Sequence, residues 1–150
     1  MKTLVAGVGS PILTDDGVGF HLARRLEKLP LPADVDVLAL GTAGLDLLEF
    51  ARGYDRLIVV DAIVTGAKPG KIFELSGDRL DKAVHATSSH EADLSTSLAF
   101  CRKLLGKEMP TEVVLIAVEA RDLITFSEQL TPEVEEALDD VLDRVMKRLT

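Results

Sequence analysis

The stretch Arg56-Leu57-Ile58-Val59-Val60-Asp61 decides the fold class of this 150-residue chain. Its interior is uninterrupted apolar sequence, rich in the β-branched side chains that favour extended backbone. A strand without polar alternation is buried on both faces, as in the middle of a parallel sheet that helices cover on both sides. The sequence therefore predicts a central strand, with the carboxylate of Asp61 at its carboxyl end.

Other short apolar runs predict the remaining strands of the sheet. These runs occupy residues 3–8, 35–40, 71–75 and 112–118. The run 71–75 follows a Pro69-Gly70 turn and alternates apolar with polar residues, unlike the continuous central stretch. We therefore expect 71–75 to form an edge strand with one face more exposed.

Helical patterns separate these strands. The first helix is expected to begin near Gly17, and the second to run from about residue 45 to a stop at Gly53. The third should start at the capping box Ser88-Ser89-His90-Glu91 and run to about Leu105. The fourth should begin after Thr131-Pro132. The last pattern is the clearest, because its apolar residues form one stripe along the helix. Strands alternating with helices predict an α/β sandwich with a mostly parallel sheet, formed by one domain over residues 1–150.

The charge and hydropathy of the chain exclude several classes of function. Seventeen Lys and Arg against 25 Asp and Glu leave a net charge of −8, which repels nucleic-acid backbones. The hydrophobic content of 47% indicates a folded protein, yet no apolar run approaches the ~18 residues of a membrane span. The first residues lack the features of a signal peptide, so we expect a cytoplasmic protein.

Several familiar chemical motifs are absent. Gly7-Val8-Gly9-Ser10-Pro11 superficially matches a dinucleotide loop, but Ile12 stands where the third glycine is needed and no acid closes the second strand. The chain has no Gly-x-Ser-x-Gly elbow, P-loop or Cys-x-x-Cys pair. Its only cysteine, Cys101, lies in an apolar helical pattern and is interpreted as a buried structural thiol.

Two carboxylates and one imidazole remain as candidates for chemistry. Asp16 lies in the loop after the first strand, Asp61 closes the third strand, and His90 stands at the head of a helix. Ligands of α/β sheets bind beyond the carboxyl ends of strands, where these three residues are expected to meet. Such a set suits a borderline divalent metal such as nickel or zinc, and it leaves coordination positions open for substrate or water.

Each of these residues also has a structural interpretation. Asp15 or Asp16 can cap the helix that follows, Asp61 can accept hydrogen bonds from backbone amides, and His90 can be an ordinary polar residue of a first helical turn. A role for Asp15 as general base also stays open. The other two histidines are expected to be structural, solvated or half-buried, and they are His21 and His85.

The loop Gly41-Thr42-Ala43-Gly44 follows the second strand at the same edge of the sheet. It carries no strong metal ligand, but its glycines permit a close backbone approach, and an extended peptide needs main-chain partners. We therefore expect Gly41 and Thr42 to contact a ligand through the main chain rather than to bind metal; with the family resemblance described next, this ligand is the tail of the substrate. Alternatively, the glycines only start the next helix.

At these residues the chain resembles the hydrogenase maturation endopeptidase family. The resemblance covers the whole chain and is strongest in 7–19, 41–45, 59–62, the Pro69-Gly70 turn with the strand after it, and Ser89-His90. It implies a three-layer α/β/α sandwich of the phosphorylase/hydrolase-like kind. The implied sheet has five strands in the order 2-1-3-5-4, with strand 4 antiparallel.

The resemblance also implies a function. Family members remove the carboxyl-terminal extension from the large subunit of nickel-iron hydrogenases after nickel insertion, and their metal ligands correspond to Asp16, Asp61 and His90. The implied partner is a nickel-loaded large-subunit precursor, and the implied metal is a divalent ion, Ni²⁺ supplied by that substrate. Two alternatives are an endopeptidase of the same fold that acts on another protein, and a binding module that inspects nickel loading without cutting.

Overall fold

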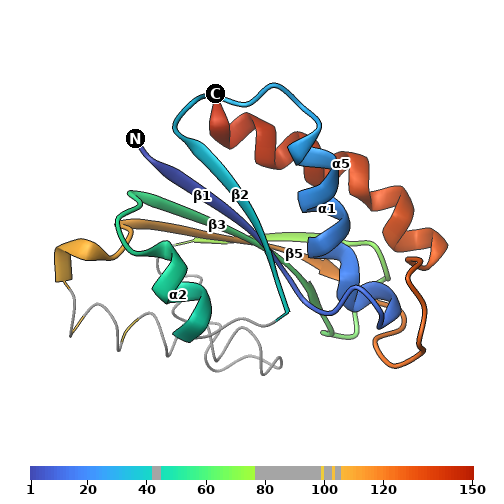
Figure 1. Cartoon of the computed structure of the whole chain (residues 1–150). Coiled ribbons are helices and arrows are strands. Elements are labelled where there is room, and N and C mark those ends of the chain that lie inside the picture. The colour runs from blue at the N-terminus through green and yellow to red at the C-terminus, as the bar shows by residue number, and fades with distance from the viewer. Residues whose placement is uncertain (42–44, 77–98, 100–102, 104–105) are drawn as a thin grey trace.

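The computed structural model of the chain describes residues 1–41, 45–76, 99, 103 and 106–150. Its centre is a five-stranded sheet in the order β2-β1-β3-β5-β4, as the family resemblance implied (Figure 1). The strands are β1 (Thr3–Val8), β2 (Val35–Leu40), β3 (Arg56–Ile63), β4 (Ile72–Ser76) and β5 (Glu112–Glu119). All neighbouring strands pair in parallel except β4, which runs antiparallel to β5 at the edge. The predicted edge strand is therefore confirmed.

Helices lie on both faces of this sheet. Helices α1 (Val18–Glu27) and α5 (Pro132–Leu149) cover one face, and α2 (Leu45–Ala51) lies on the other (Figure 1). In the described part of the chain, short 3-10 turns occupy Thr14–Gly17 and Gly106–Glu108. The helix predicted from the capping box near Ser88 falls outside the described residues, as does Cys101. None of the described helices is long and apolar enough to cross a membrane.

Strand β3 contributes to the hydrophobic core on both faces of the sheet, as its continuous apolar sequence predicted. Leu57 and Val59 belong to the cluster under α2, whereas Ile58 and Val60 belong to the cluster under α1 and α5. All four side chains are fully buried. Full burial stabilises each such side chain by roughly 1.5–3 kcal/mol, so β3, which carries Asp61, is held firmly in place.

Helix α5 covers its face of the sheet with the predicted apolar stripe. Its buried residues are Val134, Ala137, Leu138, Val141, Val145 and Leu149, and Leu142 is partly buried. Two arginines on α5 also bind the edge strand, since Arg144 and Arg148 donate hydrogen bonds to Glu74 of β4 at 3.0 and 2.9 Å. Partial burial opposes ionisation of Glu74, but the two arginines outweigh it and lower the pKa of that carboxyl below its ordinary value.

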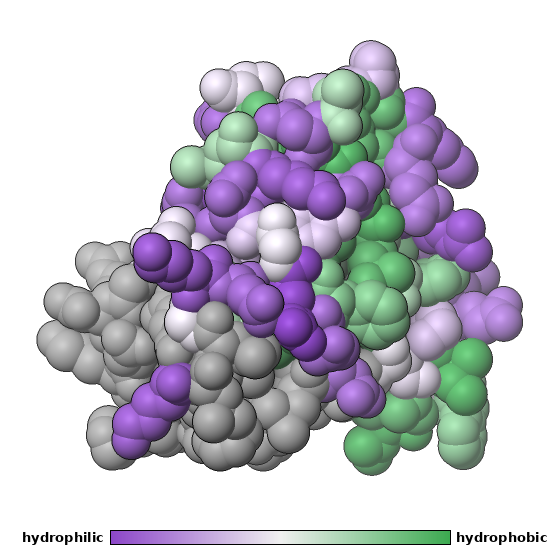
Figure 2. Space-filling view, turned by 60° about the vertical axis from the view of Figure 1, so that its left-hand side comes forward, coloured by the Kyte–Doolittle hydropathy of each residue, from purple (hydrophilic) through white to green (hydrophobic). Residues whose placement is uncertain are grey.

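Polar side chains cover most of the surface seen in Figure 2. Hydrophobic surface is gathered mainly along the right-hand side and at the lower right of that view. Exposed large hydrophobic residues occur in several loops, and they include Ile12, Val64, Ile124 and Phe126.

Candidate active site

Asp16 lies in the 3-10 turn that follows β1, and the backbone before it holds its carboxylate in place. The amide of Ser10 donates a hydrogen bond to Asp16 Oδ2 at 2.8 Å. Gly9 has a φ of 119°, and a Cβ added there would lie 2.0 Å from the carbonyl oxygen of Asp16. Glycine is therefore needed at position 9 for two reasons, its positive φ and the close approach of the turn.

Helix α1 sits unusually close to the sheet, which brings the Asp16 turn over β3. A Cβ on Gly19 would lie 2.4 Å from the amide nitrogen of Val8 and 2.5 Å from the carbonyl oxygen of Val60. Only glycine permits that approach between helix and strand backbones. The glycines quoted for the family resemblance thus fix the position of the loop that carries Asp16.

Asp61 lies at the same edge of the sheet, but not at the end of its strand. The register pairs Gly7 with Val60, so Val8, the last residue of β1, lies level with Asp61. On the other side β3 continues beside β5 as far as Ile63, opposite Glu119. The prediction that Asp61 closes the strand was therefore wrong by two residues, because pairing with β5 prolongs the ladder after β1 has ended.

The Asp61 carboxylate is buried, with 4% of the residue exposed. Its Oδ1 accepts a hydrogen bond from the amide of Ala62 at 2.8 Å, as the structural interpretation of this residue expected. This bond orients the carboxylate. Asp16 and Asp61 are thus two oriented carboxylates at the carboxyl edge of β1 and β3, where α/β sheets bind ligands.

The other predicted site residues are only partly described. His90 and Thr42 lie outside the described residues, and so does His85. Gly41 is exposed at the end of β2, with no described atom within 4 Å of the position that a Cβ would take. Within the described ranges, no three His, Cys, Asp or Glu side chains lie together as a metal site would require. The trio of Asp16, Asp61 and His90 therefore stays a prediction.

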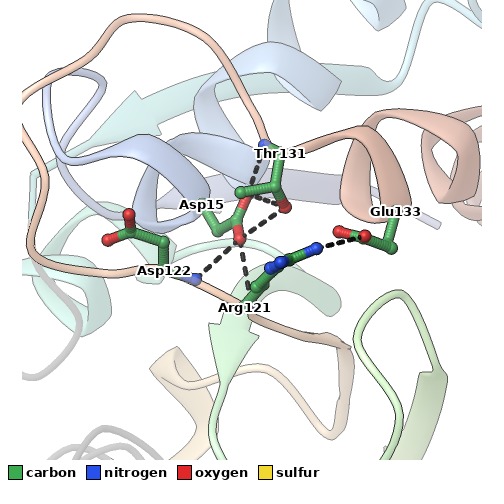
Figure 3. A network of polar contacts seen from close by, with 5 residues as sticks. All are labelled: Asp15, Arg121, Asp122, Thr131 and Glu133. Atoms are coloured by element: carbon green, nitrogen blue, oxygen red, sulfur yellow. Dashed lines mark hydrogen bonds and ion pairs between the residues drawn. The ribbon is translucent and has the colours of Figure 1, made fainter.

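Asp15 is a buried structural residue that ties the Asp16 turn to the start of α5 (Figure 3). Its Oδ2 accepts hydrogen bonds from the amides of Arg121 and Asp122 at 2.9 and 3.0 Å. Its Oδ1 accepts one from the amide of Thr131 at 2.8 Å, and the Thr131 hydroxyl lies 2.8 Å from Oδ2. Both oxygens are thus engaged with donors and shielded from solvent. Asp15 is consequently unsuited to the role of general base.

Neither aspartate caps the following helix, since the caps of the 3-10 turn and of α1 contain no side-chain hydrogen bond. Thr131 likewise makes no side-chain cap for α5, because its hydroxyl faces Asp15.

His21 is half-buried, and its Nε2 lies 3.0 Å from the carbonyl oxygen of Glu128. The structural role expected for His21 is confirmed.

The sequence of the chain matches that of a known protein family over most of its length. Residues 20–148 match the model of the hydrogenase maturation protease family. The chain belongs to this family. Membership makes it a protease of hydrogenase maturation, as the sequence resemblance predicted.

Individual relatives agree with this assignment. The hydrogenase 2 maturation protease of Escherichia coli K12 is 33% identical over 99% of this chain and 91% of its own length. The solved structure of the hydrogenase maturating endopeptidase HybD from E. coli superposes with a TM-score of 0.87, covering 99% of this chain and 92% of that chain at 33% identity. A nickel-iron hydrogenase maturation protease from Thermococcus kodakarensis, 24% identical, shares the fold with a TM-score of 0.84 over 100% of both chains.

Proposed function

We propose that this protease removes the carboxyl-terminal extension of a nickel-loaded hydrogenase large-subunit precursor in the cytoplasm, and that it recognises the nickel with Asp16, Asp61 and His90. The observation that carries the proposal is the pair of oriented carboxylates, Asp16 and Asp61, at the ligand-binding edge of a hydrogenase maturation protease fold. Nickel belongs to the substrate in this proposal, so the protein needs no metal of its own.

The chemistry of the donors supports this proposal. Carboxylates and an imidazole suit a borderline divalent ion, and three protein ligands leave room for ligands from the precursor. Burial of Asp61 strengthens its attraction for a cation, because the interaction is less screened than in bulk water. A divalent metal beside a peptide bond supplies Lewis-acid polarisation or an activated water. The role of the two carboxylates is to hold the nickel so that the scissile peptide lies at this edge.

The backbone at the end of β2 supports a second part of the proposal, in which Gly41 and Thr42 bind the tail of the substrate. Gly41 is exposed beside β1, whose carboxyl end leads to Asp16. An extended tail that passes Gly41 could pair with its main chain before reaching the carboxylates. Because no atom of the described residues lies within 4 Å of a Cβ added at Gly41, Gly41→Val should leave the fold intact and raise the KM for precursor.

The decisive experiment is mass spectrometry of a nickel-loaded precursor before and after incubation with this chain. We expect many equivalents of precursor to lose the extension, whereas nickel-free precursor should remain uncut. Asp16→Asn and Asp61→Asn should abolish the cut, and Asp143→Asn on the exposed side of α5 serves as the matched control. Stoichiometric binding without cleavage would instead identify a checkpoint protein. Equal cutting of nickel-free precursor would refute recognition through the metal.

A further inference from the structure

Two loops beside the Asp16 turn expose large hydrophobic side chains to solvent. Ile12, in the loop after β1, is 49% exposed, and Ile124 and Phe126, in the loop between β5 and α5, are 84% and 81% exposed. We call these three residues the apolar loop patch. The two loops lie together at the lower right of the fold in Figure 1. Clustered exposed hydrophobics of this size typically mark an interaction site.

The two loops are joined to each other by backbone pairing. Leu13 forms a parallel bridge with Ser127, and the amide of Ser127 donates to the carbonyl of Ile12 at 3.0 Å. In parallel register, the neighbour of Ile12 across this bridge is Phe126. The backbones of Ile12 and Phe126 therefore lie next to each other although the two residues are far apart in the sequence.

The loop that carries Ile124 and Phe126 is also fixed internally. The Asp122 carboxylate accepts hydrogen bonds from the amides of Ile124 and Thr125, both at 2.9 Å. Hydrogen bonds from the Thr125 side chain and backbone lower the pKa of Asp122, so it remains ionised and keeps this turn. The hydroxyl of Thr14 donates to the carbonyl of Thr125 at 2.6 Å, which attaches the loop to the Asp16 turn. The exposed side chains are thus held ready for a partner, which limits the entropy lost on binding.

We propose that the apolar loop patch docks a complementary apolar surface on the folded body of the large-subunit precursor. This inference rests on the proposed function, because the patch continues directly into the segment that carries Asp16. Ile12 lies four residues before Asp16 in the sequence. The hydrogen bonds of Asp15 attach the loop between β5 and α5 to the turn that carries Asp16. A protein whose peptide reaches Asp16 would lie beside these loops, because both are attached to the turn that carries Asp16. The patch itself contains no charged side chain, so it selects an apolar protein surface rather than the peptide's charged ends.

The test measures processing of full-length nickel-loaded precursor by the intact chain with Phe126→Ser, Ile124→Ser and the double variant. Aromatic anchors at the centre of an interface commonly carry most of the binding energy. We therefore expect the double variant to raise KM about tenfold or more with kcat within about twofold of the parent. Leu29→Ser is the matched control, since Leu29 is 36% exposed just beyond the carboxyl end of α1 and should leave KM unchanged.

Three outcomes would overturn the proposal. If the parent cuts precursor and the double variant shows an unchanged KM, the docking surface is wrong while the proposed function stands. If the variants instead dissociate a dimer of the parent in sedimentation, the occupant is a second copy of this chain. If the parent neither binds nor cuts nickel-loaded precursor, both proposals fail. Circular dichroism and urea unfolding of each variant ensure that a raised KM is not a loss of folded protein.

Discussion

Asp15→Asn tests whether the first aspartate of the turn is structural, because it removes the charge and keeps the shape. Two amides, those of Arg121 and Asp122, face Oδ2, and the amide of Thr131 faces Oδ1. The Thr131 hydroxyl lies between the two oxygens, 3.0 Å from Oδ1 and 2.8 Å from Oδ2. The side-chain carbonyl oxygen of the introduced asparagine should therefore turn toward the two amides, and its NH₂ group toward Thr131. The Thr131 hydroxyl can accept from that NH₂ group, but the Thr131 amide has no acceptor left.

The expected cost follows from this arrangement. One buried amide without a partner costs about 1–3 kcal/mol, and the two surviving bonds together lose about 1 kcal/mol when the acceptor becomes neutral. We expect Asp15→Asn to lose about 2–4 kcal/mol of unfolding free energy. Asp15→Ala leaves three amides without an acceptor and, at about 1–3 kcal/mol for each, should lose about 3–9 kcal/mol. Either loss is a substantial fraction of the total unfolding free energy, which is about 5–15 kcal/mol for a domain.

Urea unfolding followed by circular dichroism measures these losses. With a slope of about 2 kcal/mol per molar urea, Asp15→Asn should lower the midpoint by about 1–2 M. Thr131→Val keeps the backbone amide and removes only the hydroxyl, so it should cost about 1 kcal/mol. This control separates loss of the carboxylate from loss of one side-chain bond.

Activity of the same variant decides between structure and chemistry. In the folded state, Asp15→Asn should process precursor at a rate close to that of the parent. A fall in kcat of about 10²–10⁴, typical of a lost general base, in a variant that unfolds at the parental urea midpoint would refute the structural role.

Three further predictions concern packing, pH and the site. Gly19→Ala should lower the unfolding free energy by about 1–3 kcal/mol, because its Cβ would meet backbone atoms of β1 and β3. Gly41→Ala should change the unfolding free energy by less than about 0.5 kcal/mol, and equal effects of the two substitutions would contradict the close packing of α1 on the sheet. The pKa of Glu74 is lowered in the folded state, so its contribution to stability should be complete at neutral pH and lost as pH falls through that pKa. Unfolding free energies of the parent and of Glu74→Gln, measured between about pH 6 and about pH 3, check this, and parallel curves of free energy against pH would contradict it. Asp61→Asn should keep a side-chain oxygen that accepts from the Ala62 amide, and it should stay folded while losing nickel-dependent processing. If isothermal titration shows that this variant binds Ni²⁺ as tightly as the parent does, Asp61 is not part of the nickel site.

The strand pattern of the fold could be predicted from sequence because local composition determines it. The uninterrupted apolar run of β3 predicted a central strand, and the alternation in β4 predicted an edge strand. The exact end of β3 could not be predicted, since the ladder with β5 extends to Ile63 through pairing with residues far along the chain. Strand boundaries depend on partners as much as on the strand itself.

The site was less predictable than the fold. Asp16 and Asp61 could be selected because each follows or closes a strand at the edge where α/β sheets bind ligands. Asp15 could not be assigned, since its hydrogen-bond partners lie more than a hundred positions away and nothing in the neighbouring sequence indicates them. The adjacent aspartates look equivalent in sequence, but one is half-buried at the proposed site and the other is buried among amides. His90 and Thr42 lie outside the described residues.

The hydrogen bonds of Asp15 also impose an order on the synthesis of this protease. Its carboxylate comes early in the chain, whereas the amides that hold it belong to Arg121, Asp122 and Thr131. While a ribosome is still translating the middle of the chain, the first strand and helix have already been synthesised, but the amides that hold the Asp15 carboxylate have not. The hydrogen bonds of Asp15 are therefore completed only after Thr131, the residue before the last helix, has emerged. An unfinished chain cannot present an assembled site to a hydrogenase precursor made in the same cell.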